Sequence, residues 1–216
     1  PPGQPINPVT RQEPAQKGER RVVVEGPGDT AYLIAAYRAP GASHPDYLPL
    51  VLLNAAFAGG SSLGMFGGSG SNKSSRLYKA LVNTELAASA YGSLTPTVDP
   101  FLYTINAVAQ AGRSLEEVEA ALDAELARLE ATPITEQELA KALKRAKAEF
   151  VLAGESITGQ AQLLGMTEAV IGDYTWYETV LDRLNEITLE DIERVRSTYL
   201  RPSQRTIGWY EPETTE

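Results

Sequence analysis

The sequence has 216 residues, of which 43% are hydrophobic, enough for one globular domain with a sizeable core. Its net charge of -9 disfavours binding to nucleic acid and to anionic lipid, because an acidic surface repels phosphate groups. The chain has no cysteine, which excludes disulfides, thiolate nucleophiles and cysteine-ligated metals. No apolar run approaches the roughly 20 residues that span a bilayer, so we expect a soluble protein.

The two ends of the chain differ in composition from the middle. Residues 1–19 are rich in proline, glutamine, glutamate and lysine and are typical of a linker, and residues 213–216 form a polar tail. The chain opens without an initiator methionine or a signal peptide, which predicts an excised domain or the later part of a longer protein. We expect residues 20–212 to form a single domain. The sequence leaves the compartment open between a bacterial cytoplasm and a periplasm.

The first part of this domain predicts two strands and a helix. A β-branched run at residues 21–25 predicts one strand. Residues 32–37 predict a second strand, which is continuously apolar and is therefore expected to be buried on both faces. Ser43 is the expected cap of a helix that carries apolar residues at helical spacing over residues 48–56 and stops at Gly59.

Three of the remaining helices have capping signals, in which an acidic residue follows a Ser or Thr three positions later, and they start at Ser114, Thr135 and Thr188. The other expected elements are a helix at 74–82, strands at 86–91 and 101–109, a break near Gly154 and Gly159, a helix at 176–184 and a strand at 205–210. Because the closing strand must return to the sheet, we expect an α+β fold. Its sheet should be antiparallel or mixed, with helices packed mainly on one face.

The residues do not support an active site within this chain. A catalytic zinc needs two imidazoles and a further ligand, but His44 is the only histidine, and we interpret it as an exposed turn residue. Several acidic residues between 116 and 130 read as a solvated helix face rather than an acid–base pair. They are Glu116, Glu117, Asp123, Glu125 and Glu130. Residues 67–74 nearly match a phosphate-binding loop, but Asn72 stands where a glycine should precede Lys73, so nucleotide binding is a weak hypothesis.

The most informative feature is a glycine-rich stretch at residues 59–70. A loop of this length inside a compact domain is more often functional or mobile than idle, because its glycines are costly to order. Its apolar side chains are suited to contact a peptide or a facing domain. The glycines are Gly59, Gly60, Gly64, Gly67, Gly68 and Gly70, and the apolar residues are Leu63, Met65 and Phe66.

The stretch leads into Ser-Arg-Leu-Tyr at residues 75–78, and the chain closes with a helix start at 188–192 and a turn at 199–202. This order of landmarks, which spans nearly the whole chain, resembles peptidase family M16, the pitrilysin, insulinase and mitochondrial processing peptidase family. Its members pair similar domains into a shell around an unfolded peptide. One domain carries His-x-x-Glu-His and a distal Glu as zinc ligands, and that motif is absent here.

The resemblance therefore implies the non-zinc-binding domain of an M16 zinc metalloendopeptidase, inactive by itself. No cofactor is expected in this chain, and zinc is expected in a preceding partner domain joined by residues 1–19. In many members an Arg and a Tyr from this domain reach the zinc site, but Val82 and Ser89 occupy those positions. The chain looks closer to the glycine-loop subunit of the mitochondrial processing peptidase, which is similar to a substrate-gating partner.

The expected partners are another M16-type domain, in the same polypeptide or a second subunit, and a peptide substrate. A homodimer is also compatible with the sequence. The residues expected to contact substrate or partner are Gly59, Gly60, Gly64, Met65, Phe66, Gly67, Gly68, Gly70 and Arg76. The alternative function is a structural module, similar to the core subunits of respiratory complex III, with no role in proteolysis.

Overall fold

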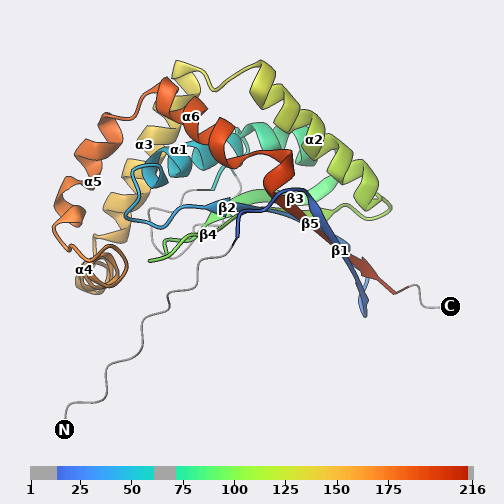
Figure 1. The fold of residues 1–216 in the computed structure, drawn as a ribbon, viewed down its shortest axis with the longest axis horizontal. Helices are drawn as coiled ribbons and strands as arrows, with labels where there is room; N and C mark the ends of the chain where they lie inside the picture. Colours follow the sequence, from blue (N-terminus) through green and yellow to red (C-terminus); the bar gives the residue numbers. More distant parts are fainter. Residues whose placement is uncertain (1–13, 61–71, 214–216) are drawn as a thin grey trace, which may run out of the picture.

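The computed structural model describes residues 14–60 and 72–213 and shows a twisted five-stranded sheet with helices on one of its faces (Figure 1). The strand order is β1-β5-β2-β4-β3. The strands are β1 Arg20–Gly26, β2 Tyr32–Ala39, β3 Ala87–Leu94, β4 Phe101–Ala109 and β5 Arg205–Pro212. β1 and β5 run parallel and the other neighbours are antiparallel, so the expected α+β fold with a mixed sheet and helices on one face is confirmed.

The helices on the sheet form an inner and an outer shell. The helices are α1 Tyr47–Phe57, α2 Leu115–Ala131, α3 Glu136–Ala153, α4 Ile157–Ile171, α5 Trp176–Asn185 and α6 Leu189–Tyr199, with the short turns η1 Tyr78–Val82 and η2 Pro202–Gln204. α1, α2 and α6 contact strands of the sheet, whereas α4 and α5 pack against α3 and each other. Within residues 14–60 and 72–213, no helix is long and apolar enough to cross a membrane.

The closing strand β5 is inserted between β1 and β2, so the first and last strands of the fold lie side by side. In this register Trp209 is paired with Val23 on one side and with Leu33 on the other. The expectation that the closing strand returns to the sheet is confirmed. The bounds of the linker and of the single domain stay predictions, although β1 begins at Arg20 and β5 ends at Pro212.

The exposure of β2 differs between the two faces of the sheet, because the described helices cover one face. Leu33, Ala35 and Tyr37 are buried under the helices, whereas Tyr32 and Ile34 on the other face are each 43% exposed. The expectation that this strand is buried on both faces is wrong. The reason is that successive strand residues point to opposite faces, and here helices pack on one face alone.

Three helices start at the expected caps. The side chains of Ser114, Thr135 and Thr188 each accept a hydrogen bond from the backbone N–H three residues later and complete a capping box. Ser43, by contrast, is not a cap, because α1 begins at Tyr47. Its N-cap residue Asp46 instead accepts hydrogen bonds from Arg194 and from the Tyr199 hydroxyl, which ties α1 to α6.

The two glycines that were expected to interrupt the long helical segment have different positions. α3 ends at Ala153 and Gly154 is its C-cap residue, so the break is confirmed there. Gly159 instead lies in the first turn of α4 and donates its N–H to the Ser156 side chain at 2.9 Å. The helix expected at residues 74–82 is short. Its regular part is the π-helical turn η1, a rare form that occurs mostly as single turns.

The core lies between the sheet and the inner helices, and Leu122 of α2 is fully buried in it. We expect Leu122→Ala to lower the free energy of unfolding by about 2–5 kcal/mol, because the lost side chain leaves a cavity. Leu164→Ala on the exposed face of α4 is the matched control and should cost less than about 1 kcal/mol. Urea unfolding of both variants measures the difference, and equal losses would contradict this placement of the core.

Candidate functional site

The glycine-rich stretch leaves α1 at Gly59, and the described residues on its two sides meet. Gly59 has φ +81°, a left-handed conformation that suits glycine at the end of a helix, and it donates its N–H to the Asn54 carbonyl at 2.9 Å. A Cβ placed on Gly59 would lie 2.7 Å from the Cβ of Asn72. Residues 61–71 lie outside the described residues, and with them the expected contacts at Gly64, Met65, Phe66, Gly67, Gly68 and Gly70.

The Asn54 side chain is the buried anchor of the start of this stretch. Its Nδ2 donates to the carbonyl oxygens of Gly60, at 3.0 Å, and of Gly92 in β3, at 3.4 Å. Its Oδ1 accepts from the Tyr103 hydroxyl of β4 at 3.0 Å. Burial raises the pKa of Tyr103, so the phenol stays a proton donor. One amide therefore joins α1, the glycine-rich stretch and two strands.

Glycine is required on both sides of this anchor. A Cβ on Gly60 would lie 2.3 Å from the Gly92 carbonyl oxygen, and a Cβ on Gly92 would lie 2.0 Å from the Asn54 Oδ1. The backbone of the stretch thus approaches the backbone of β3, an edge strand of the sheet. A glycine within a strand commonly marks such a close approach.

The other end of the stretch is fixed by a local turn. The Asn72 Oδ1 accepts from the backbone N–H of Ser74 at 3.1 Å and from its hydroxyl at 2.7 Å. The Asn72 carbonyl accepts from the Ser75 N–H at 2.8 Å, and the Ser75 hydroxyl accepts from the Tyr78 N–H at 3.3 Å. Asx turns of this kind let a side chain replace a backbone partner, so the chain enters η1 in a defined direction.

Arg76 is buried and bonded within the domain. Its guanidinium donates two hydrogen bonds of 2.7 Å to the carboxylate of Glu138 and two more to the carbonyls of Thr132 and Pro133. These contacts fasten η1 to the connection between α2 and α3. The expected contact of Arg76 with substrate or partner stays a prediction, but four of its donors are already used inside this chain.

The described part of the chain offers no metal site. In residues 14–60 and 72–213, no three His, Asp or Glu side chains are grouped so that they could hold an ion. His44 is a half-exposed turn residue, as expected, and its Nδ1 accepts from the Asp46 N–H at 3.1 Å. The Asp46 carboxylate, held by Arg194 and Tyr199, has a pKa below its usual range, which burial only partly opposes.

The acidic face of α2 is less exposed than expected. Glu125 is buried, burial raises the pKa of its carboxyl, and its Oε2 lies 3.1 Å from the Arg128 Nε. The interpretation of Glu125 as a solvated residue is therefore wrong. Asp123 is also engaged, because its two carboxylate oxygens accept from Arg205. Helix periodicity did not reveal that Glu125 is buried or that Asp123 is bonded to an arginine of β5.

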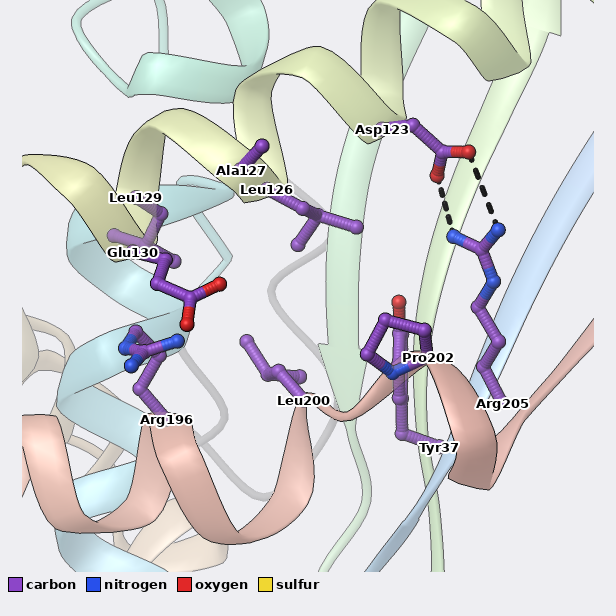
Figure 2. A pocket seen from close by; sticks show the side chains of 10 residues that line it. All are labelled: Tyr37, Asp123, Leu126, Ala127, Leu129, Glu130, Arg196, Leu200, Pro202 and Arg205. Carbon is purple, nitrogen blue, oxygen red and sulfur yellow. Dashed lines mark hydrogen bonds and ion pairs between the residues drawn. The ribbon is translucent and has the colours of Figure 1, made fainter. Parts of the chain in front are cut away.

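A cavity of about 290 Å³ lies between α2, α6 and the start of β5 (Figure 2). Figure 2 shows the Asp123–Arg205 pair on one side and Arg196 beside Glu130 on the other. Arg196 is itself bonded to Glu193 through its Nε and Nη2. Because carboxylates of the chain already neutralise both arginines, the cavity does not offer a free cation to a ligand, and we assign it no chemical role.

The described residues of the site can therefore position a segment of the chain through hydrogen bonds and close backbone contacts. The residues that do the positioning, Asn54, Gly92 and Tyr103, were missed from the sequence. Two signals pointed to them: a single amide in the otherwise apolar run of α1, and a glycine inside a strand. Neither signal identifies the partner, because the contacts join residues far apart in the chain.

Residues 1–146 match the sequence model of a family described as the peptidase M16 inactive domain. A comparison with curated proteins found no match. Among solved structures, a protease from Helicobacter pylori is similar over 97% of this chain, with 24% identity and a TM-score of 0.84. This chain covers 48% of that protein, about half its length.

Two further structures extend the comparison. The inactive peptidase domain of a candidate zinc protease from Bordetella parapertussis has 28% identity and a TM-score of 0.72, over 86% of this chain and 94% of that one. A chain of complex III2 from Candida albicans has 15% identity and a TM-score of 0.71, over 88% of this chain and 45% of that one. At that identity the likeness shows the fold alone.

The close approach at Gly92 predicts a sharp effect of a single methyl group. Gly92→Ala should lower the free energy of unfolding by about 1–3 kcal/mol or more, because its Cβ would displace the Asn54 amide and leave buried polar atoms unpaired. Gly165→Ala in α4 is the matched control, since a Cβ there meets nothing within 4 Å, and it should stabilise by about 0.5–1 kcal/mol. Thermal or urea unfolding distinguishes the two signs.

The Arg76–Glu138 pair predicts a pH dependence. Arg76 and the capping bonds of Thr135 lower the pKa of Glu138 from 4.5 to about 2. Because the folded-state pKa is depressed, the contribution to stability is present above pH 4.5 and is lost as the pH falls toward 2. The difference in unfolding free energy between wild type and Glu138→Gln should therefore shrink from pH 7 to pH 3. A difference that stays constant would show that Glu138 does not titrate in this way.

Proposed function

We propose that this chain, which belongs to the family of peptidase M16 inactive domains, acts as the non-catalytic partner domain of a zinc metalloendopeptidase. In this role it forms part of a chamber around a peptide and presents the glycine-rich stretch to that peptide. The zinc is held by another M16 domain, either in the same polypeptide or in a second subunit. Cleavage takes place there, and this chain contributes binding and gating.

The observation that carries this proposal is the anchoring of the glycine-rich stretch. Asn54 fixes its start to β3, and the Asn72 turn fixes its end. Gly59 and Asn72 lie against each other, so the two described ends of the stretch meet at one place on the domain. A glycine-rich segment that only connected two helices would not need a buried amide and two tight backbone contacts to hold it at a sheet edge.

The residue types suit recognition of unfolded peptides. Glycine leaves backbone N–H and C=O groups accessible without side chains, so an extended peptide can be bound through its main chain whatever its sequence. We assign contact with the peptide or the facing domain to Gly59, Gly60, Gly64, Gly67, Gly68 and Gly70, with Met65 and Phe66 as apolar contacts. Arg76 would support the stretch from inside the domain, through Glu138.

The relation of this chain to longer proteins supports a second M16 domain as the partner. It covers about half of the Helicobacter pylori protease but nearly all of the Bordetella parapertussis inactive domain. The same fold therefore makes up about half of a longer protein in one case and the inactive domain of a candidate zinc protease in the other. A peptidase that uses this domain in either arrangement needs zinc ligands from elsewhere.

A structural module without a role in proteolysis is the second candidate. The likeness in fold to a chain of complex III2 favours it, because that assembly contains the same fold. The two candidates differ in one property. A gating domain must change the kinetics of peptide cleavage by its partner, whereas a structural module must not.

We expect the purified chain to contain no stoichiometric zinc by elemental analysis and to show no chelator-sensitive cleavage of a fluorogenic peptide. Mixing it with the zinc-bearing M16 domain encoded with it should raise kcat/KM for that peptide by at least tenfold, which corresponds to about 1.4 kcal/mol. The double variant Met65→Ser, Phe66→Ser should raise KM, whereas the exposed Val98→Ser should leave it unchanged.

Two results would count against the proposal. Chelator-sensitive cleavage by the chain alone would place a metal site within it. Equal kinetics of the zinc-bearing domain with and without this chain would favour the structural module instead.

A further inference from the structure

The edge strand β1 is exposed on both faces. Val22, Val23 and Val24 are 51%, 56% and 49% exposed, although successive residues of a strand point to opposite sides. Figure 1 shows β1 at the margin of the sheet, with its end projecting past the helical layer. Within the described residues, β1 pairs with β5 alone, so its outer edge carries unpaired backbone groups.

The segments beside β1 leave this outer edge uncovered. Before the strand, Gln16 donates to the Arg205 carbonyl at 2.7 Å and the Pro14 carbonyl accepts from Arg38 at 3.1 Å, so the chain crosses toward β5 and β2. After the strand, the Pro27 carbonyl accepts from the Tyr210 hydroxyl at 2.8 Å. β1 itself has no proline, no lysine and no bulge, the features that usually prevent edge-to-edge pairing.

We propose that the outer edge of β1 pairs with β1 of a second copy of this chain, antiparallel and with Val23 on the two-fold axis. Such an axis is perpendicular to the sheet, so residues that face each other lie on the same side of both sheets. With Val23 at the centre, Val22 faces Val24 of the other copy and Arg21 faces Glu25.

The neighbouring registers are less favourable. If Val22 lay on the axis, Val23 would face the Arg21 guanidinium and Val24 would face Arg20, so two valines would lie opposite charged groups. If Val24 lay on the axis, Val23 would face the Glu25 carboxylate. Only the register centred on Val23 matches apolar with apolar side chains and opposite charges with each other, so the sequence of β1 is complementary to itself.

In this register Arg21 faces Glu25 across the axis. The Arg21 guanidinium is already held by Glu119, with two hydrogen bonds of 2.7 Å, and by Glu19 at 2.9 Å, while 47% of its side chain remains exposed. In the described part of the chain, Glu25 has no ion-pair partner. An exposed ion pair whose arginine is already bonded to two carboxylates adds little affinity. The three facing pairs of valines and the backbone bonds therefore supply the attraction and select the register.

Sedimentation velocity over a range of micromolar concentrations tests this dimer. The wild-type chain should show a monomer–dimer equilibrium. Val23→Lys places two ammonium groups side by side on the axis and should weaken dimerisation by at least about tenfold, because like charges across an interface are strongly unfavourable. Val98→Lys, at a site that is 63% exposed and lies outside β1, is the matched control and should dimerise like wild type.

Cysteine crosslinking tests the register, because the chain has no cysteine of its own. Facing residues of an antiparallel pair have Cβ atoms roughly 4.5–5.5 Å apart, close enough for a disulfide after small adjustment. Oxidised Val23→Cys should form a covalent dimer by itself. Val22→Cys and Val24→Cys should each stay monomeric when oxidised alone and should crosslink when mixed.

Three outcomes would overturn the proposal. The first is a wild-type chain that stays monomeric throughout the concentration range. The second is crosslinking of Val22→Cys alone as readily as of Val23→Cys, which would exclude this register. The third is loss of the Val23→Cys crosslink when a zinc-bearing M16 domain is added in equal amount, which would make that domain the occupant of the edge.

Discussion

The buried Asn54 amide is the interaction on which the candidate site depends. It bonds to the Gly60 and Gly92 carbonyls and accepts from Tyr103, so α1, β3, β4 and the start of the glycine-rich stretch share one polar centre. Each of these groups would cost about 1–3 kcal/mol if it were buried without a partner. The apolar packing around the amide therefore favours one arrangement of Gly60 against Gly92 at the edge of the sheet.

The sequence predicted those features that depend on neighbours in the chain. The capping boxes at Ser114, Thr135 and Thr188 and the helix break at Gly154 need only local residues. Contacts between distant segments were missed. The cap at Ser43 failed because Asp46 and the distant Tyr199 set the start of α1, and periodicity alone could not show that Glu125 turns toward the interior.

The polar residues of the candidate site hold the fold together, and the described ones do not form a metal site. Arg76, the arginine of the Ser-Arg-Leu-Tyr element, donates its hydrogen bonds within the domain, to Glu138 and to two backbone carbonyls. No grouping of metal ligands occurs in the residues described. What distinguishes this domain is the way in which its glycines allow two backbones to approach. In the proposed function, that contact orients a peptide or a facing domain, and cleavage takes place in the zinc-bearing partner.

Hydrogen–deuterium exchange on this chain with its zinc-bearing partner, in the presence and absence of an uncleavable extended peptide, tests the central claim most directly. If the anchored stretch receives the peptide, backbone amides of residues 59–72 and of β3 should exchange more slowly when peptide is bound. Slower exchange confined to the partner domain, with residues 59–72 unchanged, would contradict a role of the stretch in peptide binding.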